Sequence, residues 1–363
     1  MWGFGGWASV TTTLRPGKEK CRYFVPSGQA RATMTPFAGL LPAPCPERSR
    51  TMASALICGS LAYDTIMVFQ DQFKNHILPD KVHILNVSFL VPRMRREFGG
   101  CAGNIAYNLK LLGGDPIPMA TVGQDFEPYR EHFEACEIRL DHVKTLADLY
   151  TAQAFITTDL DDNQITAFHP GAMMRSYENH VRDVKDVGFG IVGPDGYEAM
   201  LQNSKEFAEL DIPFIFDPGQ AMPLFNGKEL TQMIEQSTYV TVNDYESNLL
   251  QEKTGLSEKD IAERVQAYII TRGPKGSEVH TQGGELHIPA ATAMRVVDPT
   301  GCGDAYRAGL IFGLMNGMDM ATTGRIASLM GALKIEHLGP QNQRFDYEEF
   351  AEQFRQQFGY ALR

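Results

Sequence analysis

Between residues 190 and 271, short apolar runs alternate with longer segments in which apolar residues recur at helical spacing. The apolar runs predict strands at Gly190–Val192, Phe214–Asp217, Tyr239–Val242 and Ala267–Thr271. The longer segments predict amphipathic helices at Ala199–Leu210, Lys228–Glu235 and Glu258–Val265. Strands that alternate with helices are typical of a parallel sheet covered by helices, so we expect an α/β fold.

The chain on either side of this block extends the pattern. Further strands are expected at Ala55–Ser60 and Ile117–Val122, and a hairpin at Ser277–Thr281 and Glu285–Pro289. Further helices are expected at Ile105–Leu112, Tyr129–Cys136, Ile326–Leu338 and Tyr347–Phe358. Together these elements predict one domain over residues 52–363.

Two regions, at about 64–98 and 150–169, are rich in β-forming residues and interrupt the alternation. They predict strands at Thr65–Phe69, Val82–Val87, Tyr150–Thr157 and Gln164–Phe168. The last two strands are joined by an acidic turn at 159–163. We expect a small separate sheet over the carboxyl ends of the main strands, acting as a lid that excludes water from the site.

Residues 1–51 differ from the rest of the chain. They are rich in Gly, Pro, Ser, Thr and Arg without a sustained period, which predicts a poorly ordered extension. Three glycines interrupt the apolar residues of Met1–Val10, so this segment does not fit an export signal. Met52 directly precedes the first expected strand, and we expect translation to start there.

Composition excludes several classes of protein. A net charge of -11 and a pI near 5.3 argue against a nucleic-acid-binding protein, which needs a basic face. No apolar run approaches the ~18 residues that a membrane span requires. The six cysteines contain no CxxC pair, so free thiols in a reducing cytoplasm are expected rather than disulfides or zinc.

The stretch 296–307, VVDPTGCGDAYR, joins an expected apolar strand end to an apolar helix. Gly301 and Gly303 bring backbone amides close to a ligand, and the helix that begins here directs its free N–H groups at the same point. A phosphate group suits such a site. Asp304 would lie in the first helical turn beside that phosphate, where it could accept a proton from an attacking hydroxyl. The alternative is that Asp298 and Asp304 serve only as a helix cap and a first-turn acid.

Other polar groups follow the expected strands. Ser60 and Asp64 come just after the first strand, and a glycine-rich stretch at 99–103 leads to Asn104 at the start of a helix. Polar segments at 217–220, 243–246 and 271–276 follow three more strands. Because the carboxyl ends of parallel strands share one edge, we expect these groups to line one site. Asp64 as a turn former and Asn104 as a helix cap are the alternatives.

Two of these stretches resemble the signature motifs of the ribokinase-like (PfkB) carbohydrate kinase family. The first is GGCAGNIA at 99–106, with Gly113 and Gly123 after it, and the second is DPTGCGD at 298–304, with Ala308 and Gly309 after it. The segment NDYE at 243–246 resembles the NxxE element of the same family. The resemblance covers about residues 53–340 and implies a central, mostly parallel sheet with helices on both faces plus a small β-sheet lid.

The resemblance implies a role for each matching residue. Asp304 would be the catalytic base, next to an anion site built from the amides of Gly301, Cys302 and Gly303. The acceptor substrate would be bound by Ser60, Asp64, Ser88, Gly100, Asn104, Phe168 and Gln220. ATP would be bound by Asn243, Thr271, Gly273 and Gly276, with Glu246 acting on Mg²⁺ through water. A requirement for K⁺ is left open.

Within the family, the chain looks most like the bacterial adenosine kinases. This likeness implies that ATP phosphorylates the 5′-hydroxyl of adenosine, with Phe168 stacked on the base. A second stacking aromatic is missing, because Ala154 stands at the expected position and Phe155, one residue on, would face the other way. A ribokinase or another sugar kinase, and a nucleoside-binding protein without catalysis, are the alternatives. The lid could also join two copies of the chain into a homodimer.

Overall fold

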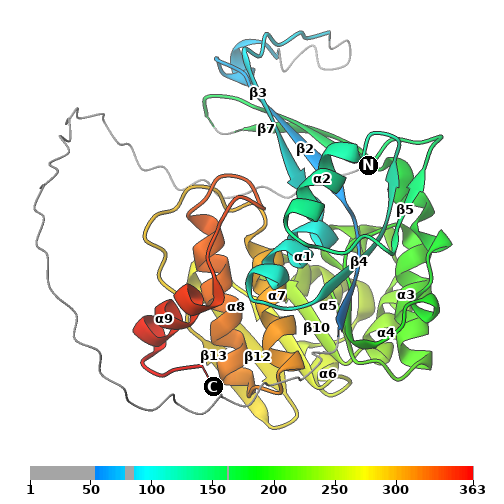
Figure 1. Ribbon diagram of the computed structural model, residues 1–363, viewed down its shortest axis with the longest axis vertical. Helices are drawn as coiled ribbons and strands as arrows, with labels where there is room; N and C mark the ends of the chain where they lie inside the picture. The colour runs from blue at the N-terminus through cyan, green and yellow to red at the C-terminus, as the bar shows by residue number, and fades with distance from the viewer. Residues whose placement is uncertain (1–53, 78–85, 162, 363) are drawn as a thin grey trace, which may run out of the picture. The chain divides into compact units, whose positions relative to one another are not determined.

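The computed structural model describes residues 54–77, 86–161 and 163–362 (Figure 1). Contacts along the chain divide it into residues 1–51 and 52–363. The predictions for residues 1–51 and for Met52 lie outside the described residues, as do residues 82–85 of the strand predicted at Val82–Val87. Within the described part of the chain, no helix has the length and apolar character that a membrane crossing requires.

A nine-stranded sheet forms the centre of the domain, in the order β13-β12-β11-β10-β9-β8-β1-β4-β5. All neighbouring strands are parallel except the antiparallel pairs β11–β12 and β12–β13. Its strands are β1 (Ser54–Cys58), β4 (Pro116–Gly123), β5 (Val143–Leu146), β8 (Val187–Val192), β9 (Phe214–Phe216), β10 (Tyr239–Asn243), β11 (Ala267–Thr271), β12 (Ser277–Thr281) and β13 (Gly284–Ile288). The predicted α/β fold with a mostly parallel sheet is confirmed.

Helices cover both faces of this sheet (Figure 1). They are α1 (Cys101–Leu111), α2 (Glu127–Ala135), α3 (Tyr197–Glu209), α4 (Gly227–Gln236), α5 (Asp244–Thr254), α6 (Glu258–Ala262), α7 (Cys302–Met315), α8 (Met320–Ile335) and α9 (Tyr347–Phe358). Alternate residues of a strand point to opposite faces. Ala55 and Ile57 of β1 therefore pack with α1, α7 and α8, whereas Leu56 and Cys58 belong to the core beneath α3 to α6.

The lid is a four-stranded sheet in the order β3-β2-β6-β7. Its strands are β2 (Ala62–Val68), β3 (Arg93–Gly99), β6 (Ala152–Thr158) and β7 (Gln164–His169). The prediction of a strand at Val82–Val87 is wrong for Asn86 and Val87, which lie in no strand. The fourth strand of this sheet is β3, which the sequence analysis did not predict. Its sequence RMRREFG is too charged to be recognised from β propensity.

The segment at 296–297 and helix α5 are among the other places where the structure differs from the sequence predictions. Val296 and Val297, expected at a strand end, lie in an irregular segment and are exposed, so apolar character alone misled the prediction. Helix α5 was not predicted because its sequence DYESNLLQEKT has few apolar residues and no clear period. Asn243 begins α5 with a capping box that includes Glu246, and this pair was the available signal.

Close contact between α7 and α8 depends on small residues. A Cβ atom added at Gly309 of α7 would lie 2.5 Å from Cα of Ala327 in α8, which is closer than real side chains approach. We expect Gly309→Ala to lower the free energy of unfolding by about 1–3 kcal/mol, because the helices must move apart. Urea denaturation measures this change.

Gly331→Ala in α8 is the matched control for this substitution. The nearest atom to its added Cβ would be 3.6 Å away, an ordinary contact. Alanine also favours the helix, so we expect no loss of stability and a gain of up to about 1 kcal/mol. Equal effects of the two substitutions would contradict the packing argument.

Candidate active site

The turn before α7 is built around Asp298 and Gly301. Oxygens of the Asp298 carboxylate accept hydrogen bonds from the amides of Thr300 and Gly339, each at 2.9 Å. Burial alone would raise the pKa of Asp298, but the hydrogen bonds from Gly339 and Thr300, together with the charge of Lys334, hold the pKa below its ordinary value. Gly301 is the N-cap and has φ of 78°, a left-handed conformation that glycine adopts without strain. The charged Asp298 therefore fixes the turn that ends in the first turn of α7.

The amides at this helix start are not all free. The amide of Cys302 donates to the carbonyl of Pro299 at 3.1 Å. Gly301, Gly303 and Asp304 are then the residues at this helix start whose N–H groups the helix geometry leaves without an intrahelical acceptor. The start of α7 is thus suited to an anion, with the positive end of the helix dipole behind it.

Asp304 lies in the first turn of α7 and is held by Asn104. The Asn104 Nδ2 donates to Asp304 Oδ2 at 2.8 Å. Burial of the carboxyl group raises the pKa of Asp304 to about 6, and the hydrogen bond from Asn104 and the charge of Arg307 oppose that rise. A carboxyl with this pKa is ionised at neutral pH and is a better proton acceptor than an ordinary aspartate.

Asn104 is itself positioned by buried polar groups. It lies inside α1, which begins at Cys101, so it does not cap the helix as the alternative interpretation held. Its Oδ1 accepts from Gln341 Nε2 at 2.9 Å, and the same nitrogen donates to the Tyr129 hydroxyl at 2.7 Å. The Tyr129 hydroxyl donates to the carbonyl of Gly99 at 2.8 Å. These bonds fix the amide orientation in which nitrogen faces Asp304.

Ser60 and Gly100 form the junction between β1 and α1. The Ser60 hydroxyl accepts from the amide of Cys101 at 3.2 Å, and its carbonyl accepts from the amide of Ala102 at 3.0 Å. Gly100 has φ of 83°, and a Cβ atom there would lie 2.5 Å from the Ser60 carbonyl oxygen. Glycine at this position lets the N-terminus of α1 approach the end of β1.

Asp64 and Phe168 lie on the same face of the lid. The strand register places Asp64 opposite Ala154, and Ala154 opposite Phe168. Phe155 lies on the other face, so the prediction that Ala154 rather than Phe155 shares the face of Phe168 is confirmed. Burial raises the pKa of Asp64 to about 6, and the nearby carboxylate of Glu97 adds to the rise. The Phe168 side chain is 47% exposed, so an apolar ring is open to a ligand at the far end of the row.

A buried ion pair links the two halves of the site. Arg307, three residues after Asp304 on α7, donates through Nε and Nη2 to both oxygens of Asp217, and the Nη2 bond is 2.9 Å long. Arg307 Nη1 also donates to the Gly303 carbonyl at 3.2 Å, and Nη2 lies 4.0 Å from Glu246 Oε2. The pairing of Arg307 with Asp217 was not predicted. Its sequence signal was an arginine in the middle of an apolar helix, because such a charge needs a buried partner.

Glu246 belongs to the capping box of α5. Its carboxylate accepts from the Asn243 amide at 2.8 Å, while the Asn243 side chain accepts from the Glu246 amide at 2.8 Å. Burial raises the pKa of Glu246, and the charge of Arg307 opposes the rise. These contacts leave Glu246 able to accept a hydrogen bond from water, which fits an indirect role toward a hydrated Mg²⁺.

The residues expected to bind ATP follow two neighbouring strands. Asn243 ends β10 directly beside Thr271 at the end of β11. Gly273 and Gly276 form the turn after β11, both with positive φ, and a Cβ at Gly276 would meet the Ile288 carbonyl oxygen at 2.0 Å. These four residues therefore line one edge of the sheet.

Ser88 and Gln220, which are also expected to bind the acceptor, form no side-chain hydrogen bond to the other expected site residues in the described part of the chain. Ser88 lies on an exposed segment before β3, next to Phe89, whose ring packs against Phe69 and Phe73. Gln220 is exposed in the turn that follows β9, three residues after Asp217. Their binding roles stay predictions.

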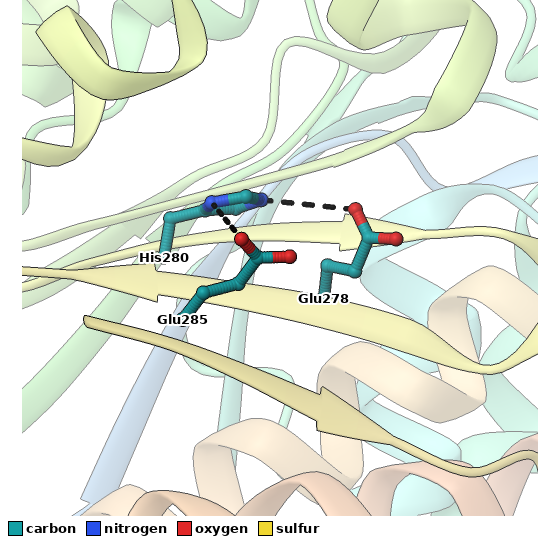
Figure 2. A group of neighbouring side chains, drawn as sticks. All are labelled: Glu278, His280 and Glu285. Carbon is teal, nitrogen blue, oxygen red and sulfur yellow. Dashed lines mark ion pairs between the residues drawn. The ribbon is translucent and has the colours of Figure 1, made fainter.

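A separate group of potential metal ligands lies on the β12–β13 hairpin. Figure 2 shows His280 between the carboxylates of Glu278 and Glu285. The His280 Nε2 lies 3.8 Å from an oxygen of Glu278, and its Nδ1 lies 4.0 Å from an oxygen of Glu285. Different ring nitrogens face the two carboxylates, and Arg272 already pairs with Glu278 at 2.6 Å. These contacts favour a network of charged side chains over a metal centre.

Comparison with known proteins gives one family for this fold and site. The model of the pfkB family carbohydrate kinases matches residues 62–345. The structure of a nucleoside kinase from Burkholderia thailandensis in complex with inosine is 55% identical, with a TM-score of 0.78, over 85% of this chain and 99% of that chain. A nucleoside kinase of Methanocaldococcus jannaschii is 30% identical over 70% of this chain and 85% of its own length. The ribokinase of Bacillus subtilis is 26% identical over 67% and 83%.

Asp195, after β8, is a buried carboxyl that the sequence analysis did not single out. Its Oδ1 accepts from the Ser176 hydroxyl at 2.7 Å and from the Gly196 amide at 2.8 Å. Burial raises the pKa of Asp195 to about 7. The folded protein therefore binds this proton more tightly than the unfolded chain, so its contribution to stability is complete below about pH 4 and is lost as the pH rises to about 7.

We expect Asp195→Asn to remove the loss of stability that occurs as the pH rises, because an amide oxygen can accept the same two hydrogen bonds without a charge. The variant should be more stable than the parent protein at pH 8, by roughly 2–4 kcal/mol, and nearly equal to it at pH 4. Urea denaturation at both pH values measures the difference. A variant less stable at pH 8 would show that the carboxylate is stabilising when charged.

Proposed function

The chain belongs to the pfkB family of carbohydrate kinases, and from this premise we propose that it transfers the γ-phosphoryl group of ATP to the 5′-hydroxyl of a purine nucleoside. The observation that carries the proposal is the hydrogen bond from Asn104 to Asp304 at the start of α7. This bond holds an ionisable carboxyl at the start of α7, which supports a base next to the helix terminus that we expect to bind an anion. The row from Asp64 to Phe168 on the lid supplies a polar end and an aromatic end for the acceptor.

In this mechanism the 5′-hydroxyl of the acceptor lies next to Asp304. Asp304 accepts the hydroxyl proton as the oxygen attacks the γ-phosphorus, and the bond from that phosphorus to the β-phosphate oxygen breaks to release ADP. The amides of Gly301 and Gly303, with the dipole of α7, stabilise the negative charge that develops on the transferred group. Glu246 would hold a hydrated Mg²⁺ through water, and the ion would supply positive charge to the phosphates of ATP. Asp64 accepts hydrogen bonds from ribose hydroxyls, which fixes the distance between acceptor and phosphate.

A nucleoside fits the site better than a free sugar because of Phe168. The exposed ring of Phe168, at the other end of the row from Asp64, has no partner on a bare ribose, whereas a purine base can stack on it. The inosine complex of the Burkholderia thailandensis enzyme supports a purine acceptor. Adenosine is the acceptor that the sequence predicts, and inosine is the first to compare with it. A ribose kinase is the second candidate, supported by the ribokinase of Bacillus subtilis.

Asp304→Asn should retain the fold and lower turnover by a factor on the order of 10² to 10⁴, the range for loss of a general base. In the parent protein, kcat/KM should fall below about pH 6 as Asp304, whose pKa is about 6, becomes protonated. A coupled assay of ADP release at a series of pH values measures both. Glu348→Gln in the first turn of α9 is the control for a first-turn acid. If Asp304→Asn keeps more than about a tenth of the activity, the carboxylate is not the base.

Phe168→Ala should raise KM for adenosine or inosine by roughly tenfold to a hundredfold, because stacking of a base contributes about 1–3 kcal/mol. Any activity on ribose should barely change. Phe155→Ala, on the opposite face of the same sheet, is the matched control and should leave both substrates unaffected. If ribose is phosphorylated better than either nucleoside, or if Phe168→Ala affects all acceptors equally, the sugar-kinase alternative is correct.

A further inference from the structure

Lys334 is a buried cation near the C-terminal end of α8. Its side chain is fully buried. The Nζ donates to the backbone carbonyl of Asp298 at 2.8 Å and to that of His337 at 3.1 Å. Both acceptors are uncharged oxygens, so this ammonium is held in the way that carbonyl oxygens hold a monovalent metal ion.

The two carbonyls belong to the two segments that support the anion site. Asp298 directly precedes the turn at 299–303, and His337 lies in the turn after α8. The same segments are joined by the amides of Val297 and Asp298, which donate to the Ile335 carbonyl at 2.8 and 3.1 Å. A Cβ atom at Gly301 would lie 2.7 Å from Pro340 Cβ, so the backbones are in close contact. Lys334 therefore lies directly behind the turn that would face a phosphate.

A buried charge is costly unless it is compensated, and a lysine is rarely found fully inside a protein. Burial lowers the pKa of Lys334, and the negative charge of Asp298 opposes the shift. The positive charge of Lys334 also affects the pKa of a group in the neighbouring turn. Burial raises the pKa of the Cys302 thiol to about 11, and the charge of Lys334 opposes this rise. In a low-dielectric environment, the same field favours an anion bound at the start of α7.

We propose that Lys334 acts as a built-in monovalent cation for the anion site, fixing the turn at 299–303 and presenting a positive charge to the transferred phosphoryl group. This inference rests on the proposed kinase function. Since the ammonium already occupies the carbonyl oxygens, the enzyme needs no K⁺ or NH₄⁺ from solution. Removing the side chain leaves a small cavity lined by those oxygens, which a dissolved monovalent cation can enter.

The experiment compares Lys334→Ala, which opens the cavity, with Lys334→Met, which fills it without a charge. Lys253→Ala is the matched control, because Lys253 Nζ also donates to a backbone carbonyl, that of Phe225 at 2.9 Å, in another part of the fold. Turnover with ATP and adenosine or inosine is measured in NaCl, KCl and NH₄Cl at equal ionic strength. Thermal unfolding is measured in the same salts without substrates.

We expect the parent protein and Lys253→Ala to turn over equally, within twofold, in all three salts. Both Lys334 variants should lose at least tenfold in kcat in NaCl, with a smaller change in KM for the nucleoside. The kcat of Lys334→Ala should be at least fivefold higher in KCl or NH₄Cl than in NaCl, and its unfolding temperature should also be higher. Neither quantity should rise for Lys334→Met.

Stimulation of the parent protein more than threefold by K⁺ or NH₄⁺ would overturn the proposal, as would a Lys334→Met variant with parental kcat. If Lys334→Ala does not fold, the parent protein and Lys334→Met still decide between these outcomes. If no acceptor is phosphorylated at all, the proposed function fails. The salt-dependent unfolding temperature of Lys334→Ala then tests the cation site alone.

Discussion

The hydrogen bond between Asn104 and Asp304 joins the first turns of α1 and α7, two helices that are 200 residues apart in the sequence. Each helix begins at a glycine whose conformation lets the backbone turn sharply, Gly100 before α1 and Gly301 before α7. The bond therefore sets the distance between two helix N-termini that point into the same space. Gln341 holds Asn104 from behind, so the segment after α8 also takes part in this constraint.

Burial, rather than pairing with an opposite charge, has the largest effect on the pKa of Asp64 and Asp304. Asp304 and Asp64 both have a pKa raised to about 6, mainly because their carboxyl groups are removed from water. Arg307 does not neutralise Asp304 directly, since it is engaged by both oxygens of Asp217. The arginine thus moderates the basicity of Asp304 without blocking its oxygens. A carboxylate in direct contact with the guanidinium would be a weaker base.

The sequence was most informative where local pattern and backbone chemistry coincide. Buried strands such as β10 and β11 are recognisable from apolar runs, and the glycines at 100 and 301 mark positions with positive φ. The register of Ala154 and Phe168 follows from the two-residue period of a strand. In contrast, the charged strand β3 is held in its sheet by pairing with β2, which no local signal reveals. The contact of Gln341 with Asn104 and the burial that raises the pKa of Asp304 depend on the tertiary fold.

The lid is continuous with the site at its base. Only Gly59, Ser60 and Leu61 separate β1 from β2, and β3 leads through Gly100 directly into α1. A rigid-body movement of the lid must therefore pull on the end of β1 and on the N-terminus of α1, from which Asn104 reaches Asp304. The geometry around the base is then coupled to the position of the lid. In the proposed mechanism, this coupling would align Asp304 only when an acceptor holds the lid closed, and it would thereby suppress the hydrolysis of ATP by water.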